Sequence, residues 1–318
     1  MRLRGKPFAE GIRKHGDRPY QQETVTRFGE LVCQASAHVA EFFALLEAGS
    51  SGRIGIAESI SRDGLHRVAE DKDLFVNVGT TLSSAGYPSR HALRVGMLAM
   101  SVGATLGWDE RTLLDLGIGC LIHDVGMLGL DRAMYQSKRI LAPSDFAEIA
   151  KHPVLVFETL RRGLDHVPPA AQMVAYQMHE RSNGSGYPRG YAADRIHDLA
   201  KVAAVADVFI ALISPRPHRP GMVPYHAMKK ILHDTKQSVY DATSVRGLLQ
   251  TVSLFPIGSY VALSDGQLGR VIRAAAEQYD RPIVEAWHRS DVSPSPMVVD
   301  LSAQDELKIT GAVASLDG

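Results

Sequence analysis

The sequence has few cysteines, no long apolar run and no excess of charge of either sign. Its 318 residues include only two cysteines, Cys33 and Cys120, which lie far apart and form no CxxC pair. This argues against a disulfide framework and is typical of a reducing compartment. No run of about 18 apolar residues is present, and no apolar core follows the basic N-terminus. We therefore expect neither a membrane-spanning helix nor a secretory leader.

The charge balance excludes partners that need a strong global field. Lys+Arg and Asp+Glu each total 35, so we expect no binding to DNA and none to an anionic membrane surface. An anionic ligand must then be held by a local basic patch. Hydrophobic residues make up 45% of the chain, which is enough for a substantial core. We expect a cytoplasmic globular protein.

Apolar residues recur at helical spacing through most of the chain, and alternating runs are confined to its C-terminal part. The expected helices are 21–46, 56–70, 73–82, 90–106, 110–123, 144–163, 168–180, 194–213 and 225–249. Near the C-terminus, two strand-like runs flank Asp265-Gly266, which is a hairpin signal, and 282–287 and 297–301 also resemble strands. The prediction is a mainly α protein with a helical N-terminal region (1–85), a helical central domain (86–250) and a small β-rich extension (251–318).

Six potential metal ligands are distributed over the helices expected in the central domain. They are His91, His123, Asp124, His152, His179 and Asp207. Side chains from successive helices can converge on one point of a helical bundle. Imidazole nitrogens and carboxylate oxygens are the ligands that a hydrolytic transition-metal centre needs.

The adjacent His123-Asp124 pair and the position of Asp207 strengthen this interpretation. In such a pair the histidine can bind one metal ion while the carboxylate bridges to a second. Asp207 ends an apolar run, so its charge must be paired or bound to a metal to offset desolvation. Two metals roughly 3.5–4 Å apart would hold a bridging hydroxide that attacks phosphorus in line. An isolated buried histidine is more often a hydrogen-bonded core residue, so the argument depends on the whole set.

The order of these residues resembles that of the HD-GYP phosphodiesterases, a branch of the HD superfamily, over about residues 86–250. The motifs that carry the resemblance are His91, His123-Asp124, His152-Pro153, His179-Glu180-Arg181, Gly186-Tyr187-Pro188 and Asp207. The resemblance implies an HD-domain helical bundle that acts in bacterial signalling. It also implies hydrolysis of cyclic di-GMP, to the linear dinucleotide or GMP, by two or three metal ions, often iron or manganese.

The resemblance also implies a role for each site residue. His91, His123, Asp124 and Asp207 would hold the first metal, and Asp124, His152 and His179 the second, with His123 and Asp124 at the catalytic centre. Arg216 and Arg219 would bind substrate phosphate, because a guanidinium offers two parallel hydrogen bonds, and His218 between them would line the pocket. Gly184, Gly186 and Tyr187 would form the signature loop, which either contacts substrate or only orders the next helix.

Four positions depart from the family pattern. Met127 replaces a lysine, Met178 replaces the first of two histidines, Asn183 replaces an aspartate, and Tyr87 replaces the glutamate of three-metal members. We therefore expect two divalent metal ions at most, and a cyclic di-GMP phosphodiesterase as the first hypothesis. The alternative is a degenerate HD-GYP protein that binds a nucleotide or a protein partner without efficient turnover. A hydrolase for another phosphate ester, and a homodimer or partner contact through the helix at 21–46, also stay open.

Overall fold

The computed structural model describes residues 6–13, 20–49, 54–81, 86–136, 139, 142–163, 166–216, 219–274, 278–288 and 296–313. His218 and Leu82, the expected end of one helix, lie outside these ranges. The α-helices are α1 (Gln22–Glu47), α2 (Ile54–Thr81), α3 (Ser89–Thr105), α4 (Glu110–Ile122), α5 (Arg132–Gln136), α6 (Pro143–Ile149), α7 (His152–Gly163), α8 (Pro169–Gln177), α9 (Asp198–Ile213), α10 (Pro224–Lys236) and α11 (Ala242–Val252). Short 3-10 helices are η1 (Phe8–Gly11), η2 (His123–Gly129), η3 (Ala193–Arg195) and η4 (Leu301–Ala303). The strands are β1 (Tyr260–Leu263), β2 (Leu268–Arg273), β3 (Ile283–Trp287), β4 (Met297–Asp300) and β5 (Ile309–Val313).

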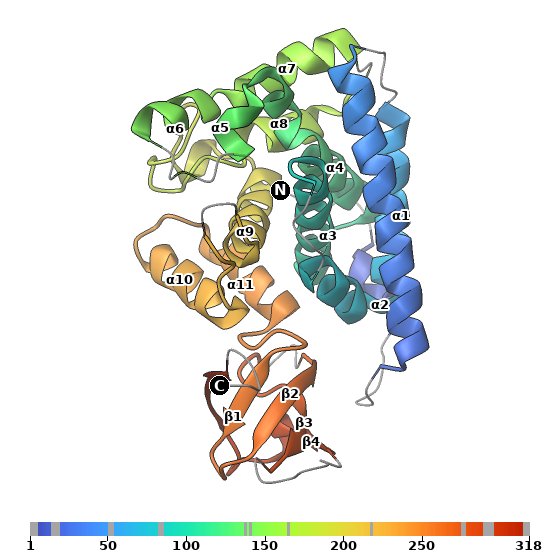
Figure 1. The fold of residues 1–318 in the computed structure, drawn as a ribbon, viewed down its shortest axis with the longest axis vertical. Coiled ribbons are helices and arrows are strands. Elements are labelled where there is room, and N and C mark those ends of the chain that lie inside the picture. Colours follow the sequence, from blue (N-terminus) through green and yellow to red (C-terminus); the bar gives the residue numbers. More distant parts are fainter. Residues whose placement is uncertain are drawn as a thin grey trace.

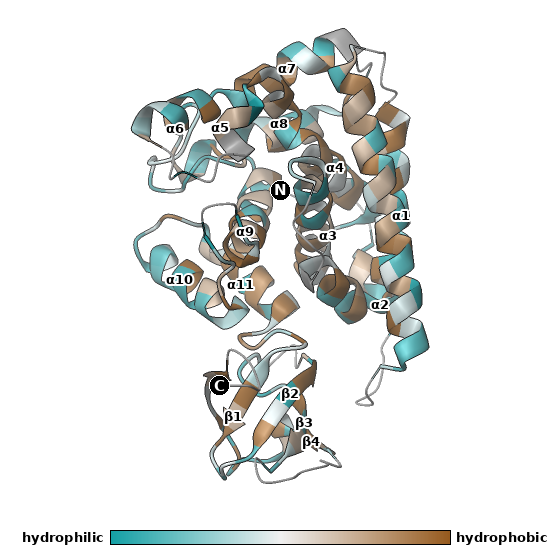
Figure 2. Cartoon of the chain, in the orientation of Figure 1, coloured by the Kyte–Doolittle hydropathy of each residue, from teal (hydrophilic) through white to brown (hydrophobic). Residues whose placement is uncertain are grey.

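Helices α3, α4 and α9 form the centre of the bundle, because their sequences are apolar on more than one face. Every residue of α3 from His91 to Ala104 is buried, and α3 contacts α4 and α9 directly. Helix α1 lies along one side of the molecule, α5 to α8 lie at one end, and the sheet lies at the other (Figure 1). Apolar colouring is concentrated on α3, α4 and α9 and polar colouring on the outer helices (Figure 2). The prediction of a mainly α protein with a small C-terminal sheet is confirmed.

Two of the expected helices are each divided in two, which corrects the sequence-based boundaries. The segment 144–163 forms α6 and α7, and 225–249 forms α10 and α11. The apolar period continues across both breaks, so periodicity alone could not locate them. At the second break Ser238 has a φ of 57°, and the Asp241 carboxylate accepts a hydrogen bond from the Ser244 amide at the start of α11 (2.8 Å).

The expected helices 56–70 and 73–82 are joined into one kinked element, α2. Asp71 lies at the kink with non-helical backbone angles (φ −159°, ψ 97°). Its carboxylate accepts hydrogen bonds from the Leu74 amide at 3.0 Å and from the Tyr20 hydroxyl at 2.8 Å. The kink is therefore fixed by a side chain that caps the second half of the helix.

The C-terminal part is a five-stranded antiparallel sheet in the order β4-β3-β2-β1-β5. The hairpin expected at Asp265-Gly266 joins β1 to β2, and Gly266 adopts a φ of +87° there. Strand β5 was missed by the sequence analysis because Gly311 interrupts its short apolar pattern. Stacking of Tyr225 on Phe255 (5.0 Å between ring centroids) connects α10 to the core under the sheet.

One segment of the described residues, Glu110–Gly129, is long and apolar enough to cross a membrane. It comprises α4 and η2, and 83% of its most apolar 18-residue window is buried inside the protein. This burial is what the core helix of a bundle shows. Cys33 is exposed, Cys120 is buried, and neither forms a disulfide.

Candidate metal centre

The structure brings the six predicted ligands together from five elements. His91 lies in the first turn of α3, His123 and Asp124 begin η2, His152 begins α7, His179 follows α8, and Asp207 lies in α9. All six side chains are buried. Four of the six lie at helix ends: His123 and Asp124 follow α4, His179 follows α8, and His152 begins α7. The site is therefore formed by the junction of helices rather than by one motif.

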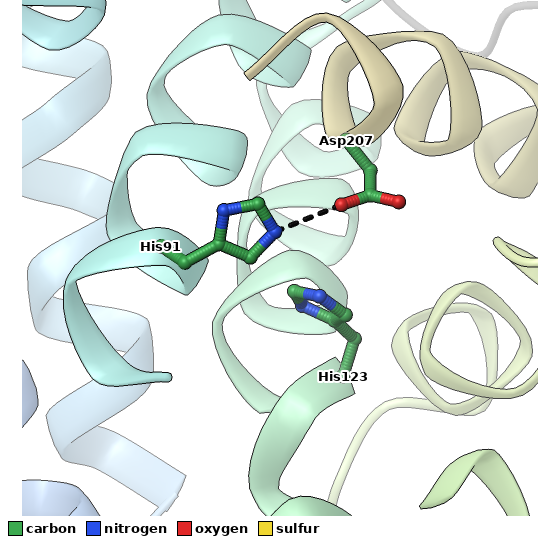
Figure 3. Close-up of side chains that lie close together, drawn as sticks. All are labelled: His91, His123 and Asp207. Atoms are coloured by element: carbon green, nitrogen blue, oxygen red, sulfur yellow. Dashed lines mark hydrogen bonds and ion pairs between the residues drawn. The ribbon is translucent and has the colours of Figure 1, made fainter. Parts of the chain in front are cut away.

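The first cluster consists of His91, His123 and Asp207. One ligand atom from each of these residues lies within 4.8 Å of the other two. The His91 Nε2 atom lies 2.9 Å from Asp207 Oδ1, and the ring centroids of His91 and His123 are 5.8 Å apart. Figure 3 shows the three side chains pointing toward one another from separate helices.

The second cluster consists of His123, Asp124 and His179, again with ligand atoms within 4.8 Å. His152 adjoins it, with its Nε2 atom 3.0 Å from His179 Nε2 and 3.5 Å from Asp124 Oδ1. His123 belongs to both clusters, and the His179 Nδ1 atom lies 3.6 Å from Asp207 Oδ2. The two clusters are therefore contiguous.

Backbone carbonyls orient two of the imidazoles. The Nδ1 atom of His123 lies 2.7 Å from the Cys120 carbonyl, and that of His152 lies 2.8 Å from the Ile149 carbonyl. Because a carbonyl only accepts, each Nδ1 carries the proton and each neutral ring presents its Nε2 lone pair to the site. A metal-ligating histidine is normally held in this way.

Two observations indicate that the residues fit a metal centre. Among the buried polar atoms of the described residues, His123 Nε2 and Asp124 Oδ2 have no hydrogen-bond partner. Buried polar atoms are rarely left in that state unless an ion or a water molecule satisfies them. In addition, two imidazole nitrogens that bind one ion at about 2.1 Å and at about a right angle lie about 3 Å apart, as the Nε2 atoms of His152 and His179 do (3.0 Å).

The electrostatics of the site favour the protonation states that metal ligands require. Burial lowers the pKa of His179 well below its ordinary value, and the neighbouring His152 adds to this effect. Burial also lowers the pKa of His152, although Asp124 partly opposes it. Burial raises the pKa of Asp207, but the hydrogen bond from His91 and the nearby imidazoles outweigh it, so the net shift is downward. His152 and His179 are therefore neutral and Asp207 is ionised near neutral pH, which are the states that bind metal.

The glycine-rich loop after α8 is packed against the histidine that precedes it. Tyr187 stacks on the His179 ring (5.0 Å between centroids, 11° between planes), and its amide donates to the His179 carbonyl. A Cβ atom at Gly186 would lie 2.4 Å from the Arg181 amide nitrogen, so only glycine fits there. Gly184 has a φ of +80°, which also favours glycine. The loop therefore holds His179 in place.

Glu180 has a role that the sequence analysis did not assign. Its buried carboxylate accepts hydrogen bonds from the amides of Arg189 and Tyr191, at 2.8 and 2.9 Å. These hydrogen bonds connect the C-terminal end of the glycine-rich loop to Glu180, the residue next to His179. Its position directly after a predicted ligand histidine was the available signal, but the partners are nine and eleven residues away.

The two predicted phosphate-binding arginines differ in their surroundings. Arg219 donates from both terminal nitrogens to backbone carbonyls, including those of Ala211 and Leu212. Arg216 instead places its guanidinium 4.5 Å from the ring centroid of Tyr87. The pKa of Tyr87 is well above its ordinary value, because burial and the nearby Asp124 carboxylate disfavour the phenolate. Tyr87 therefore faces both the site and Arg216, one turn before His91.

Met127 and Met178, which replace the family's lysine and histidine, are both fully buried. Met178 packs into an apolar cluster with residues such as Val174 and Leu199. A lysine at position 127 would have to bury an ammonium group, which is costly without a partner. Both positions therefore belong to the hydrophobic core in this chain.

Comparison with known proteins agrees with this geometry. A family model described as HD domain matches residues 80–244, which is more than half of the chain. A cyclic di-GMP phosphodiesterase of Pseudomonas aeruginosa is 26% identical over 284 residues, covering 88% of this chain and 67% of that protein. A cyclic di-GMP phosphodiesterase of Thermotoga maritima is 32% identical over 130 residues, covering 41% of this chain and 35% of that protein.

A solved structure also shares the fold. Bd1817, described as an HDG"Y"P protein from Bdellovibrio bacteriovorus, matches with a TM-score of 0.58 and 20% identity, covering 70% of this chain and 71% of that one. The HD-domain family is metal-dependent, and the clustered histidines and aspartates are groups that could bind metal. Because the family model matches more than half of the chain, this chain belongs to the HD-domain family.

Proposed function

We propose that this protein is a metal-dependent phosphodiesterase that hydrolyses cyclic di-GMP, with residues 86–250 as its catalytic domain. The observation that supports this most strongly is the convergence of four imidazoles and two carboxylates, in which His123 Nε2 and Asp124 Oδ2 are buried without a hydrogen-bond partner. The relatives from P. aeruginosa and T. maritima are named cyclic di-GMP phosphodiesterases, which supports the same substrate.

The centre would hold two metal ions, with iron or manganese suited to its mixture of imidazole and carboxylate ligands. The ligands of the first ion would be His91, His123, Asp124 and Asp207. Those of the second would be Asp124, His152 and His179. When bound, the ions supply an activated water molecule and neutralise charge on the phosphoryl oxygens.

The chain's own residues would position the substrate and supply protons. Arg216 is the phosphate-binding residue, because its side chain lies over Tyr87 near the site while Arg219 is occupied by carbonyls. Tyr87 keeps its proton near neutral pH and hydrogen-bonds to Asp124, and on substrate binding it would donate that hydrogen bond to a phosphoryl oxygen instead. These two groups would provide the polar contacts that Met127 cannot offer.

Replacing Arg216 with alanine should raise the KM for cyclic di-GMP by about 10- to 100-fold and affect kcat less. The reason is that a charge-assisted hydrogen bond contributes about 1.5–3 kcal/mol. Steady-state kinetics of Arg216→Ala would measure the change in KM, and the Arg219→Ala variant would serve as the comparison. Arg219→Ala should mainly lower the melting temperature, because four carbonyls would lose their donor. An unchanged KM in Arg216→Ala would contradict this assignment.

The proposed function is tested by measuring metal content and turnover of cyclic di-GMP on the same purified sample. The protein would first be reconstituted with iron or manganese under reducing conditions. We expect about two metal ions per chain and hydrolysis of the cyclic substrate. A linear dinucleotide and a mononucleotide, assayed in parallel, would reveal a preference for another phosphate ester.

Bound metal without turnover would contradict the phosphodiesterase and support the alternative, a protein that binds a nucleotide or a partner. The burial of Met127 and Met178 is the observation that favours this alternative. Both positions lack the groups that the family uses. Equilibrium dialysis with cyclic di-GMP, under the same conditions that gave no hydrolysis, would then measure binding of the nucleotide. Binding would indicate a nucleotide-binding protein, and its absence would indicate one that acts only on a protein partner.

A further inference from the structure

A cavity lies between α1, α2, α3 and α4, and none of the six metal-centre residues lines it. Its volume is about 210 Å³. Most of its walls are apolar side chains, among them Phe28, Val32, Phe75, Leu93, Met97 and Met100. A cavity of about 150 Å³ with such walls stays dry and takes benzene. This cavity is large enough for a molecule on the order of ten non-hydrogen atoms.

One polar group deep in the cavity wall has no partner. Ser61 is 1% exposed, and its Oγ atom makes no hydrogen bond. Gly117 faces it from α4, where a Cβ atom would lie 2.9 Å from Ser61 Oγ and 2.6 Å from Met100 Sδ. The glycine thus allows α4 to pack closely against Ser61 and Met100 without covering the hydroxyl with a side chain of its own. An unsatisfied buried hydroxyl is unfavourable, so its presence in this wall indicates a ligand that supplies the missing hydrogen bond.

The opening of the cavity is polar but offers little for an anion. Gln34, His38 and Asp63 line it and are exposed. The only guanidinium among the lining residues that the structure describes, that of Arg67, is paired with Glu70 at 2.6 Å. A carboxylate ligand would therefore bury its charge beside Ser61 without a cation, which is strongly unfavourable. An uncharged ligand fits better.

We propose that this cavity is a binding site for a small, uncharged and mostly apolar molecule with one hydroxyl or carbonyl group that hydrogen-bonds to Ser61. The ligand's apolar body would fill the space between α1 and α3. It would also contact the two helices that lead to the metal centre, since α3 carries His91 and α4 runs directly into His123. The site is distinct from the proposed cyclic di-GMP site.

The proposal is tested by titrating the full-length protein with 2-naphthol, which is neutral near pH 7 and has about the right size. Ligand fluorescence would report binding. We expect saturable binding at one site per chain. Replacing Ala35, which lines the cavity from α1, with leucine should fill it and weaken binding by at least about tenfold. The matched control is Ala37→Leu at an exposed position of α1, which should bind as the wild type does.

The hydroxyl is tested separately. Ser61→Ala should weaken 2-naphthol binding by about three- to tenfold and leave the binding of naphthalene, which has no hydroxyl, unchanged. No saturable binding to the wild-type protein, or undiminished binding to folded Ala35→Leu, would overturn the proposal. Equal 2-naphthol affinity in Ser61→Ala and wild type would overturn the role of the hydroxyl. If Ala35→Leu does not fold, Leu31→Phe on the same wall replaces it, with the same expected loss. None of these readouts depends on metal or turnover.

Discussion

Asp124→Asn is expected to reduce metal content to at most one ion per chain and turnover by about 10³-fold or more. Asparagine preserves the shape of the side chain but removes its negative charge. The carboxylate lies 3.3 Å from His123 Nε2 and 3.5 Å from His152 Nε2, so it is the group between the two halves of the site. Loss of an outer hydrogen-bond partner alone costs a metal site about 10- to 100-fold. Loss of a shared ligand should cost more.

Metal analysis by mass spectrometry and single-turnover kinetics would measure this effect. The control is Asp115→Asn, the same chemical change on α4, where the aspartate is half-buried and forms an ion pair with the exposed Arg111 (3.5 Å). Asp115→Asn should keep full metal content and turnover. If Asp124→Asn kept two ions and lost less than tenfold in rate, the carboxylate would not be a metal ligand.

The residue types of the site could be read from the sequence because their chemistry is local. Four histidines and two aspartates on expected helices indicate a metal centre, and the structure places these six side chains next to one another. The expected helices were also sufficient to assign the fold class. The metal-centre prediction depends on the chemistry of single residues, and the fold-class prediction depends on the helical period of 3.6 residues. A sequence shows both of these features directly.

The contacts that hold the site in place could not be read in this way. The Glu180 carboxylate binds amides nine and eleven residues away, and Arg219 turns toward carbonyls of α9 rather than toward the site. These arrangements depend on how loops fold back on helices. The break within 225–249 is of the same kind, because the left-handed Ser238 and the Asp241 cap overrode a continuous apolar period.

The buried methionines show what a departure from a family pattern can mean. At position 127, where the family pattern has a lysine, the chain places an apolar side chain in its core. Tyr87 was noticed only as the absence of a glutamate. In the structure its ring lies 5.6 Å from the His91 ring and under the guanidinium of Arg216. A residue that departs from the family pattern, such as Tyr87, can therefore have a different role in the site.

Gly126→Ala is expected to destabilise the protein by about 3 kcal/mol and to disturb the second metal site. A Cβ atom at Gly126 would lie 2.1 Å from the His152 carbonyl oxygen and 2.8 Å from the Val156 amide nitrogen. Both neighbours are backbone atoms of α7, so no side-chain rotation relieves the clash. Helix α7 must move away from η2 by more than about 1 Å, and overpacking of this kind costs about 1–3 kcal/mol or more.

The displacement matters for function because α7 begins at His152. A shift of about 1 Å in a group that positions a reaction can cost about 10²-fold in rate. Thermal unfolding followed by circular dichroism would measure stability, and metal content and turnover would report the displaced ligand. The destabilisation should lower the melting temperature by roughly 6–12 °C.

Gly129→Ala is the matched control in the same 3-10 helix. Its added Cβ atom would meet only Leu155 Cδ1 at 3.7 Å, which is an ordinary contact, so stability should change by less than about 0.5 kcal/mol. If Gly126→Ala were as stable and as metal-rich as Gly129→Ala, the close packing of α7 on η2 would not be what positions His152. Gly126 would then be needed only for the backbone conformation of η2. A large difference between the two variants would instead assign this glycine to the approach of α7, and so to the geometry of the metal centre.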